Sequence, residues 1–248
     1  VGIARMEDRY FQTNIIDFSE TKHDKSTYSI FGGSIVLEGS TLNARQFATQ
    51  GSREKMAAQI FTGTEHFRSG ASKVTKDTPE PYKKVQSWLQ VSYQNETYHK
   101  VSPKFTLGAY LEAYYSSRNF SNNYTATLMQ AGEFTPTAHS KVTYNEAFRA
   151  NQYAGVGAMP IYQLSESFQL RGEFYGFVPI FPIKKDEYGQ AYYGKAFTKF
   201  EYLGEISLVF QLSFGSISAY VNHYSSPSND WNVGLTLGWQ LFNSRFIE

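Results

Sequence analysis

The chain has 248 residues with 23 Lys and Arg against 22 Asp and Glu, so it lacks the basic surface expected of a nucleic-acid-binding protein. It contains no Cys, which excludes disulfides and thiolate chemistry, and no apolar run reaches the roughly 18 residues of a membrane-spanning helix. A β-barrel escapes that criterion because only every second residue of a membrane strand is apolar. The aromatic content of 17% also suits the aromatic girdles of such a barrel.

Alternation of apolar and polar residues predicts ten strands along the chain. The first is weakly patterned, whereas 104–118 and 200–212 alternate strictly, with Glu112 and Glu205 among the polar positions. A period of two places one set of side chains on each face of a sheet. In chain order, the predicted strands are 1–12, 28–39, 53–67, 84–98, 104–118, 152–164, 168–183, 200–212, 216–222 and 231–241.

The connections between these strands alternate in character. The polar and mostly long ones are 13–27, 69–83, 119–151, 184–194 and 225–230. The mostly shorter ones are 40–52, 99–103, 165–167 and 213–215. Outer-membrane barrels have long extracellular loops and short periplasmic turns, so we expect a C-terminus in the periplasm. The charged strand residues then face away from lipid, towards a wet lumen; they are Glu112, Arg171, Glu173 and Glu205.

Three segments of the chain resemble the BamA-like and two-partner-secretion barrels of Gram-negative outer membranes. They are the turn at 41–53, the turn Leu212-Ser213-Phe214-Gly215-Ser216-Ile217, and Phe148-Arg149-Ala150-Asn151 in the longest connection. The resemblance implies that the ten strands are the last ten of sixteen and that the Arg149 side chain reaches into the lumen. Ala150 and Asn151 depart from the Gly and aromatic residue of the family pattern, and the chain continues past Phe242.

A narrower resemblance covers most of the chain. The runs 144–153, 219–227 and 241–246 are similar to the C-terminal barrel of bacterial patatin-like phospholipases. This resemblance implies that residues 1–248 form one barrel domain and that periplasmic and patatin lipase domains lie upstream, outside this chain. Because Val1 is not an initiator Met, we expect the chain to be a processed or excised part of a longer protein.

No catalytic motif accompanies the predicted strands. A patatin dyad needs Ser in Gly-x-Ser-x-Gly; the nearest segment, Gly32-Gly33-Ser34-Ile35-Val36, lies inside a strand. The five His residues lack metal-binding spacing and are interpreted as surface residues, and no helix is evident. We therefore assign no catalytic, cofactor-binding or metal-binding residue.

Arg149, which follows Phe148, is the candidate functional residue. It could enter the lumen and pair with Glu173, or with another inward acidic residue on the following strands, and so hold the 119–151 segment inside the barrel. The alternative is a solvated loop Arg. Several aromatic residues are candidates either for the girdles or for the lumen; they are Tyr153, Tyr162, Tyr175, Tyr202, Tyr224, Trp231 and Trp239.

The sequence thus predicts an all-β, antiparallel transmembrane β-barrel in the bacterial outer membrane. By resemblance, it anchors or translocates a patatin-like lipid acyl hydrolase domain. The alternatives are a non-enzymatic assembly or secretion barrel, a small-solute channel, and a soluble lipocalin-like or sandwich protein. Expected partners are outer-membrane lipids and the outer-membrane assembly machinery. Ten strands could close by themselves, since even-numbered barrels start at eight. Otherwise a second copy of the chain, or missing strands of the same parent protein, would cover the open edge, because unpaired backbone groups are costly in lipid.

Overall fold

A single ten-stranded antiparallel sheet dominates the computed structural model, which describes residues 1–11, 23–70, 82–226 and 231–239. Neighbouring strands follow the order β1-β2-β3-β4-β5-β8-β9-β12-β13-β14, and each pair is antiparallel. All ten predicted strands are confirmed. Their bounds are β1 (Gly2–Tyr10), β2 (Asp24–Ser40), β3 (Gly51–Arg68), β4 (Tyr82–Lys100), β5 (Phe105–Ser116), β8 (Gln152–Gln163), β9 (Phe168–Pro179), β12 (Glu201–Leu212), β13 (Gly215–Tyr224) and β14 (Trp231–Trp239).

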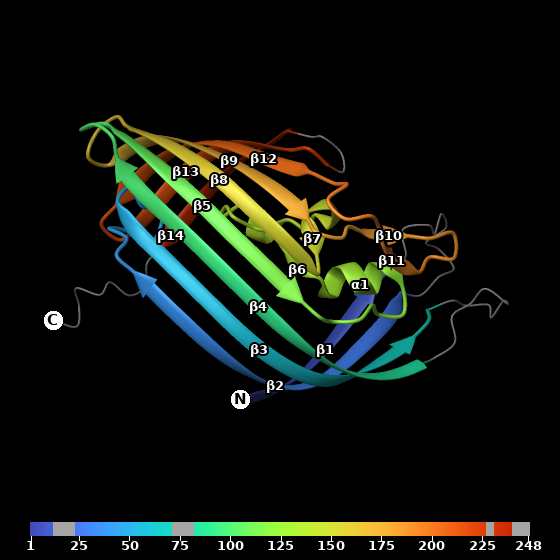
Figure 1. The fold of residues 1–248 in the computed structure, drawn as a ribbon. Coiled ribbons are helices and arrows are strands. Elements are labelled where there is room, and N and C mark those ends of the chain that lie inside the picture. Colours follow the sequence, from blue (N-terminus) through green and yellow to red (C-terminus); the bar gives the residue numbers. More distant parts are fainter. Residues whose placement is uncertain (12–22, 71–81, 227–230, 240–248) are drawn as a thin grey trace.

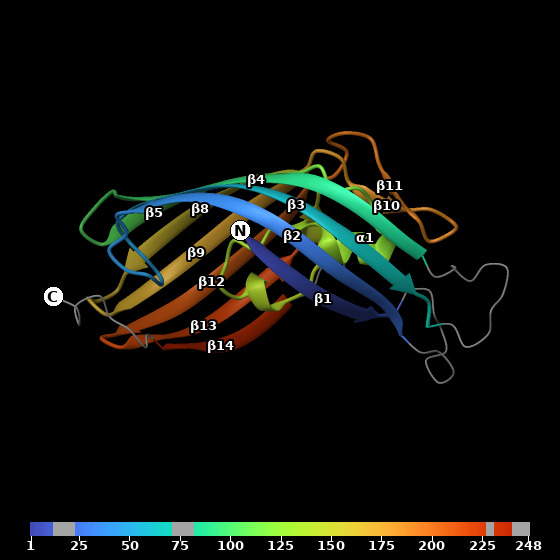
Figure 2. The ribbon, with the colours of Figure 1, turned by 90° about the horizontal axis from the view of Figure 1, so that it is seen from below.

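The sheet curls strongly but does not close. Figures 1 and 2 show the ten strands wrapping around the segment between β5 and β8, which lies on the concave side. Within the described part of the chain, β1 pairs only with β2 and β14 only with β13. In the residues that the structure describes, the ten strands therefore do not form a self-contained ring, and the sheet has two free edges.

Strand ends differ from the prediction by a few residues. Strand β2 begins at Asp24, inside a predicted loop, and β4 continues to Lys100, inside a predicted turn. In the other direction, β9 ends at Pro179 rather than at 183. Pro182 follows shortly afterwards, and a proline has no backbone N–H to donate to a sheet.

The long connections contain small elements that the sequence analysis missed. Helix α1 (Tyr124–Gln130) contradicts the prediction of no helix, and Asn123 caps it by accepting a hydrogen bond from the Ala126 amide at 2.8 Å. Seven residues are too few for a periodic signal, so the cap and burial stabilise this helix. The remaining elements are the paired strands β6 (Gly132–Glu133) and β7 (Arg149–Ala150), the paired strands β10 (Ile183–Lys185) and β11 (Ala191–Tyr193), and two 3₁₀ turns, Ser140–Val142 and Glu146–Phe148.

Each strand separates an inner from an outer row of side chains. In β9 the odd positions from Gln169 to Phe177 are buried, whereas Leu170 and Phe174 are exposed on the convex side. The same alternation turns Glu112, Arg171, Glu173 and Glu205 inwards, as predicted. Among the described residues, no helix has the length and apolar character needed to cross a membrane.

Candidate functional site

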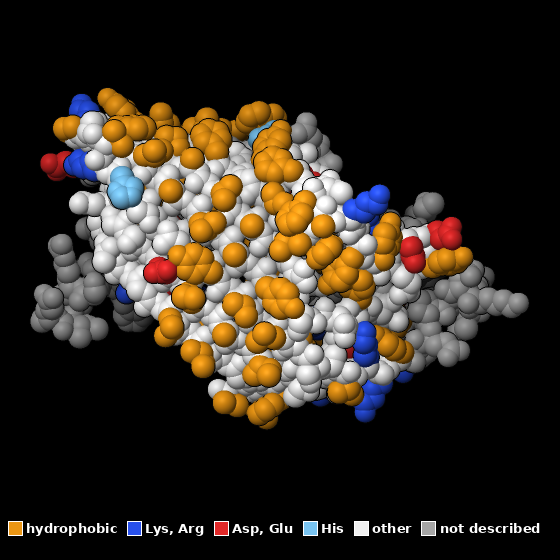
Figure 3. Space-filling model, viewed as in Figure 1, with side chains coloured by type: hydrophobic (Ala, Val, Ile, Leu, Met, Phe, Trp, Pro, Cys, Tyr) orange, Lys and Arg blue, Asp and Glu red, His pale blue; other side chains and the backbone are white. Residues whose placement is uncertain are grey.

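The outer surface of the sheet is apolar over most of its width. Along β5, β8, β9, β12, β13 and β14, no outward position in the described strands is Asp, Glu, Lys or Arg. Figure 3 shows one face of the molecule, where hydrophobic side chains are spread over the middle and most charged ones lie towards the ends. The exposed outer-row residues of these six strands include Leu107, Leu111, Tyr115, Val156, Tyr162, Leu170, Phe174, Tyr202, Ile206, Leu208, Phe210, Ile217, Trp231, Val233, Leu235 and Leu237.

Exposed aromatic residues lie near both ends of these strands. Tyr115, Tyr202 and Trp231 lie at the end that carries the long connections, and Tyr162 and Phe210 lie at the end that carries the short turns. Three other candidates for the girdles fill the interior instead; they are Tyr153, Tyr175 and Tyr224. The side chain of Trp239 lies outside the described part.

The concave side is occupied by residues 117–151, which we call the inserted segment. Phe134 of this segment packs among aromatic rings of the strands: its ring centroid lies 5.5 Å from that of Phe177, and it makes edge contacts with Tyr110, Tyr153 and Tyr175. All five of these side chains are buried. The interior is therefore a packed core here rather than an open lumen.

Arg149 is held within the inserted segment. Its guanidinium lies 2.7 Å from the Glu133 carboxylate, and it donates to the carbonyls of Leu128 and Met129 at the end of α1. The guanidinium also lies over the Tyr144 ring, 4.6 Å from its centroid. Burial raises the pKa of Tyr144, and the charge of Arg149 opposes that rise. Arg149 therefore joins α1, β6 and β7 into one unit.

The prediction of an Arg149–Glu173 pair is wrong. Glu173 pairs with Arg171, two residues away on the same inner row of β9, at 2.5 Å. Sequence reasoning missed Glu133, because it lies close to Arg149 only through the short β6–β7 ladder. Phe148, the neighbour of Arg149, is buried against Phe177.

His139 attaches the inserted segment to the wall. Its Nδ1 lies 2.7 Å from Oε1 of Glu205 on β12, and its ring stacks on Tyr220 of β13 at 3.5 Å between centroids. His139 and Glu205 are both buried, so the prediction of a surface His is wrong at this position. Glu205 also accepts a hydrogen bond from Asn222 at 3.5 Å. The inserted segment is thus fixed to β12 and β13.

Arg171 is the centre of a second buried network, at the end of the sheet that carries the short turns. Its guanidinium donates to Glu173, to the Tyr98 hydroxyl at 2.8 Å and to the Ala48 carbonyl at 2.8 Å. Tyr175 donates to the other carboxylate oxygen of Glu173 at 2.8 Å. A buried charge is tolerated only when it is paired and hydrogen-bonded, and this network meets both conditions.

The Ala48 contact belongs to the β2–β3 turn at 41–50, which we call the strap. The Phe47 carbonyl of the strap accepts a hydrogen bond from Gln211 of β12 at 3.3 Å, and Gln46 accepts one from Ser216 of β13 at 2.8 Å. The strap therefore reaches from β2 and β3 to the opposite wall of the curved sheet. It occupies the short-turn end of the interior, as the 117–151 segment occupies the other.

Arg118 anchors α1 to the N-terminal wall. Its guanidinium lies over Trp88 of β4 and Tyr28 of β2, at 4.6 and 5.2 Å from the ring centroids. It donates to Gln130 of α1 at 2.7 Å, and Gln130 donates to Asp8 of β1 at 2.6 Å. Burial lowers the pKa of Arg118, whereas neighbouring Tyr28 acts to raise it.

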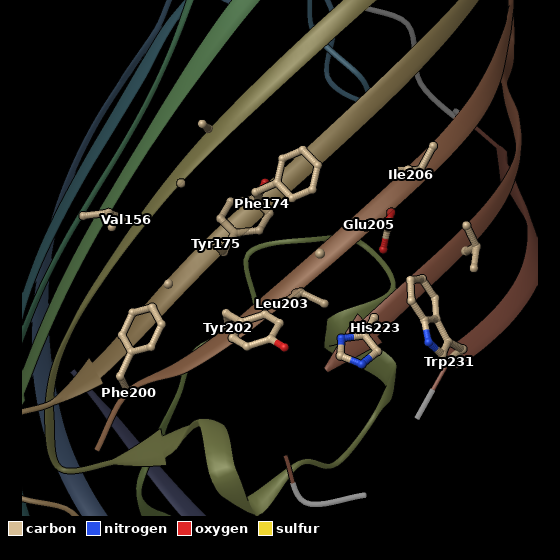
Figure 4. A pocket seen from close by; sticks show the side chains of 15 residues that line it. Val156, Phe174, Tyr175, Phe200, Tyr202, Leu203, Glu205, Ile206, His223 and Trp231 are labelled. Atoms are coloured by element: carbon tan, nitrogen blue, oxygen red, sulfur yellow. The ribbon is translucent and has the colours of Figure 1, made fainter. Parts of the chain in front are cut away.

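A groove of about 680 Å³ crosses the outer face of the C-terminal strands. Gly176, Gly204 and Ala158 form its floor, and Phe174, Phe200, Ile206 and Val221 are among the apolar residues around it. Tyr202, His223 and Trp231 gather at its edge nearest the long connections, where the His223 ring contacts both neighbours (Figure 4). Glu205 borders the groove, but its carboxylate bonds to His139 inside.

These features define an all-β protein with an occupied interior and an outer face that is free of charged residues on β5, β8, β9, β12, β13 and β14, whereas β1 carries Arg5, Glu7 and Arg9 on its outer row. Within the described residues, no cluster of three or more His, Asp or Glu side chains could hold a metal ion. Ser34 lies inside β2, where its segment forms a regular strand rather than a nucleophile turn. Compared with known protein families, curated proteins and solved structures, the chain matches none.

Proposed function

We propose that this chain is the C-terminal part of a bacterial outer-membrane β-barrel whose role is to anchor another domain. The observation that carries the proposal is the contrast between the two faces of the sheet. The outer rows of six adjacent strands lack Asp, Glu, Lys and Arg, whereas the inner rows carry buried charge networks. Transmembrane barrels reverse the usual distribution in this way, with apolar residues facing lipid and polar ones facing the interior.

The positions of the aromatic residues support the same proposal. Aromatic girdles mark the two interfaces of a transmembrane barrel, and exposed aromatic side chains lie near both ends of these strands. Contiguous apolar patches above a few hundred Å² are rare on soluble monomers. A soluble lipocalin-like or sandwich protein would therefore leave this surface unexplained.

The open edges imply further strands in the proposed barrel. An unpaired edge in lipid leaves backbone N–H and C=O groups unsatisfied, each at a cost of several kcal/mol. In our proposal, strands upstream of β1 continue the sheet and meet β14, as in the sixteen-stranded barrels that the chain resembles. Strands supplied by a second copy would be the alternative arrangement.

The occupied interior favours an anchor over a small-solute channel. The 117–151 segment is bound to β12 through His139, and the strap is bound to β9, β12 and β13. A porin needs a continuous aqueous path. We therefore expect the full-length protein in a planar bilayer to show no stable ion conductance.

The anchored domain is proposed from sequence resemblance. The runs 144–153, 219–227 and 241–246 suggest a patatin-like lipid acyl hydrolase upstream. A non-enzymatic assembly or secretion barrel would have the same sheet without that domain. Extraction from outer membranes in detergent, followed by intact mass and N-terminal sequencing, separates the two. Upstream residues with a Gly-x-Ser-x-Gly motif would support the lipase anchor. A parent protein that lacks that motif would contradict it and favour the assembly or secretion barrel.

A further inference from the structure

We propose that the groove on the outer face of β8, β9, β12 and β13 binds one acyl chain of a diacyl glycerophospholipid, with the ester and phosphate groups at the Tyr202, His223 and Trp231 edge. This inference rests on the proposed function, in which the outer face of the sheet contacts lipid. It adds a specific lipid site to that general contact.

The groove exists because small residues on the outer rows lie opposite large ring side chains on the adjacent strands, so that space is left between the rings. Gly176 on β9 is paired with Tyr202 on β12, and Gly204 is paired with Phe174 on β9 and with His223 on β13. A Cβ atom added at Gly204 would meet nothing closer than a Phe174 ring carbon at 3.6 Å, which is ordinary van der Waals contact. The floor is therefore a true recess that a larger side chain could fill.

The shape and lining of the recess fit an acyl chain. Its volume of about 680 Å³ lies within the roughly 300–1,000 Å³ of typical ligand sites. Its walls are apolar, and the inward carboxylate of Glu205 is engaged elsewhere. An acyl chain in this recess would replace contacts with lipid of the bulk bilayer by contacts with fixed side chains.

The polar atoms are confined to one edge. The rings of Tyr202 and His223 are stacked at 5.9 Å, and His223 lies 4.7 Å from Trp231. Tyr202 and Trp231 are 46% and 70% exposed, so their O–H and N–H groups can reach a ligand. Hydrogen-bond donors beside an apolar recess complement a lipid whose phosphate and ester oxygens are acceptors.

Backbone chemistry argues against a polypeptide in the same place. Strands β9, β12 and β13 each have a hydrogen-bonded neighbour on both sides, so the groove offers no free strand edge. A peptide segment, or a second copy inserting a loop, would bury N–H and C=O groups against apolar walls without partners. An acyl chain has no such groups.

The test is native mass spectrometry of the full-length protein, reconstituted in phosphatidylethanolamine–phosphatidylglycerol vesicles and extracted in mild detergent. We expect a bound phospholipid on the unaltered protein and a roughly tenfold lower ratio of lipid-bound to lipid-free protein in Gly204→Leu, equivalent to about 1.4 kcal/mol. Gly33→Leu is the matched control: it also adds Leu to the sheet's outer face, and its Cβ would meet only Val1 at 3.9 Å. It should retain the lipid.

A second variant, together with measurements of dimer formation and of membrane incorporation, keeps the test decisive. Ala158→Leu fills the same recess from β8, so it should also lose the lipid. It therefore replaces Gly204→Leu in the test if that variant fails to fold. Equal lipid retention in all variants would overturn the proposal, as would a protein dimer that only the groove-filling variants lose. Absence of the protein from the vesicle membrane would instead overturn the proposed function itself.

Discussion

Phe134 of the inserted segment lies directly against Gly155 of β8. A Cβ atom at position 155 would lie 2.1 Å from a carbon of the Phe134 ring, a separation that no folded protein tolerates without movement. The glycine thus provides the space in which the segment docks. A glycine on the inner row of β8 therefore allows the inserted segment to fill the interior.

Substitution of Gly155 should therefore displace the inserted segment. We expect Gly155→Ala to lower the free energy of unfolding by about 1–3 kcal/mol, the usual cost of overpacking a core. Gly204→Ala is the control, since it makes the same change on an outer row with ordinary contacts. Urea unfolding in detergent micelles, followed by tryptophan fluorescence, measures both. Equal stability of the two variants would contradict the packing described for Phe134.

The His139–Glu205 pair should be coupled energetically. His139→Phe keeps a ring against Tyr220 but leaves the Glu205 carboxylate buried with Asn222 as its remaining partner, so we expect a loss of about 3–5 kcal/mol. Glu205→Gln retains a hydrogen-bond acceptor and should cost less. The double variant should lose clearly less stability than the sum of the two single changes. Additive losses in the same unfolding assay would show that the two side chains do not act as a pair.

Arg149 should stabilise the inserted segment, although not through Glu173. Arg149→Ala removes the Glu133 ion pair and the hydrogen bond to the Met129 carbonyl, whereas the Leu128 carbonyl keeps the Ala131 amide as a donor, so we expect a cost of about 1–3 kcal/mol. Folded and unfolded forms of a membrane β-barrel migrate differently on a denaturing gel. The temperature at which the protein converts from the folded to the unfolded band should fall. Arg53→Ala provides the control, because its ion pair with Glu38 is exposed and such pairs contribute below about 1 kcal/mol. An unchanged shift temperature in Arg149→Ala would refute this role.

The strap should depend on Asn43 for its conformation. The Asn43 side chain accepts hydrogen bonds from the amides of Thr49 and Gln50 at 3.0 and 3.1 Å and donates to the Thr49 hydroxyl. Asn43→Ala should loosen the strap and accelerate cleavage by trypsin after Arg45, an exposed residue in the same turn. Asn232→Ala on β14 is the control and should leave that cleavage rate unchanged. A rate equal to the unaltered protein in both variants would contradict the account of the strap.

Period-two alternation was sufficient to predict the sheet. It placed all ten strands in order and assigned Arg171 and Glu173 to the inner row, because burial on one face of a strand leaves a signal at every second residue. It could not pair Arg149 with Glu133, or His139 with Glu205. Those contacts arise where an irregular segment folds back on a distant strand, and such segments carry no periodic signal.

The long-range contacts of the strap also could not be predicted from the sequence. Its length and composition predicted a short turn, and Gly51 with a positive φ fits that prediction. The contacts that draw it inwards come from Arg171, Gln211 and Ser216, more than a hundred residues later in the sequence. Only the three-dimensional curvature of the sheet brings these residues within reach of the strap.

The most direct test of the central claim uses the absence of Cys from this chain. A single Cys at Leu111, Ile206 or Leu235, each on the outer row, can carry an environment-sensitive fluorophore in the vesicle-reconstituted full-length protein, with any Cys of the upstream region replaced. A membrane-facing sheet predicts strong quenching at all three positions by acyl-chain nitroxide lipids and little quenching by aqueous iodide. Strong iodide quenching without lipid quenching at these positions would contradict the claim that this face contacts the bilayer.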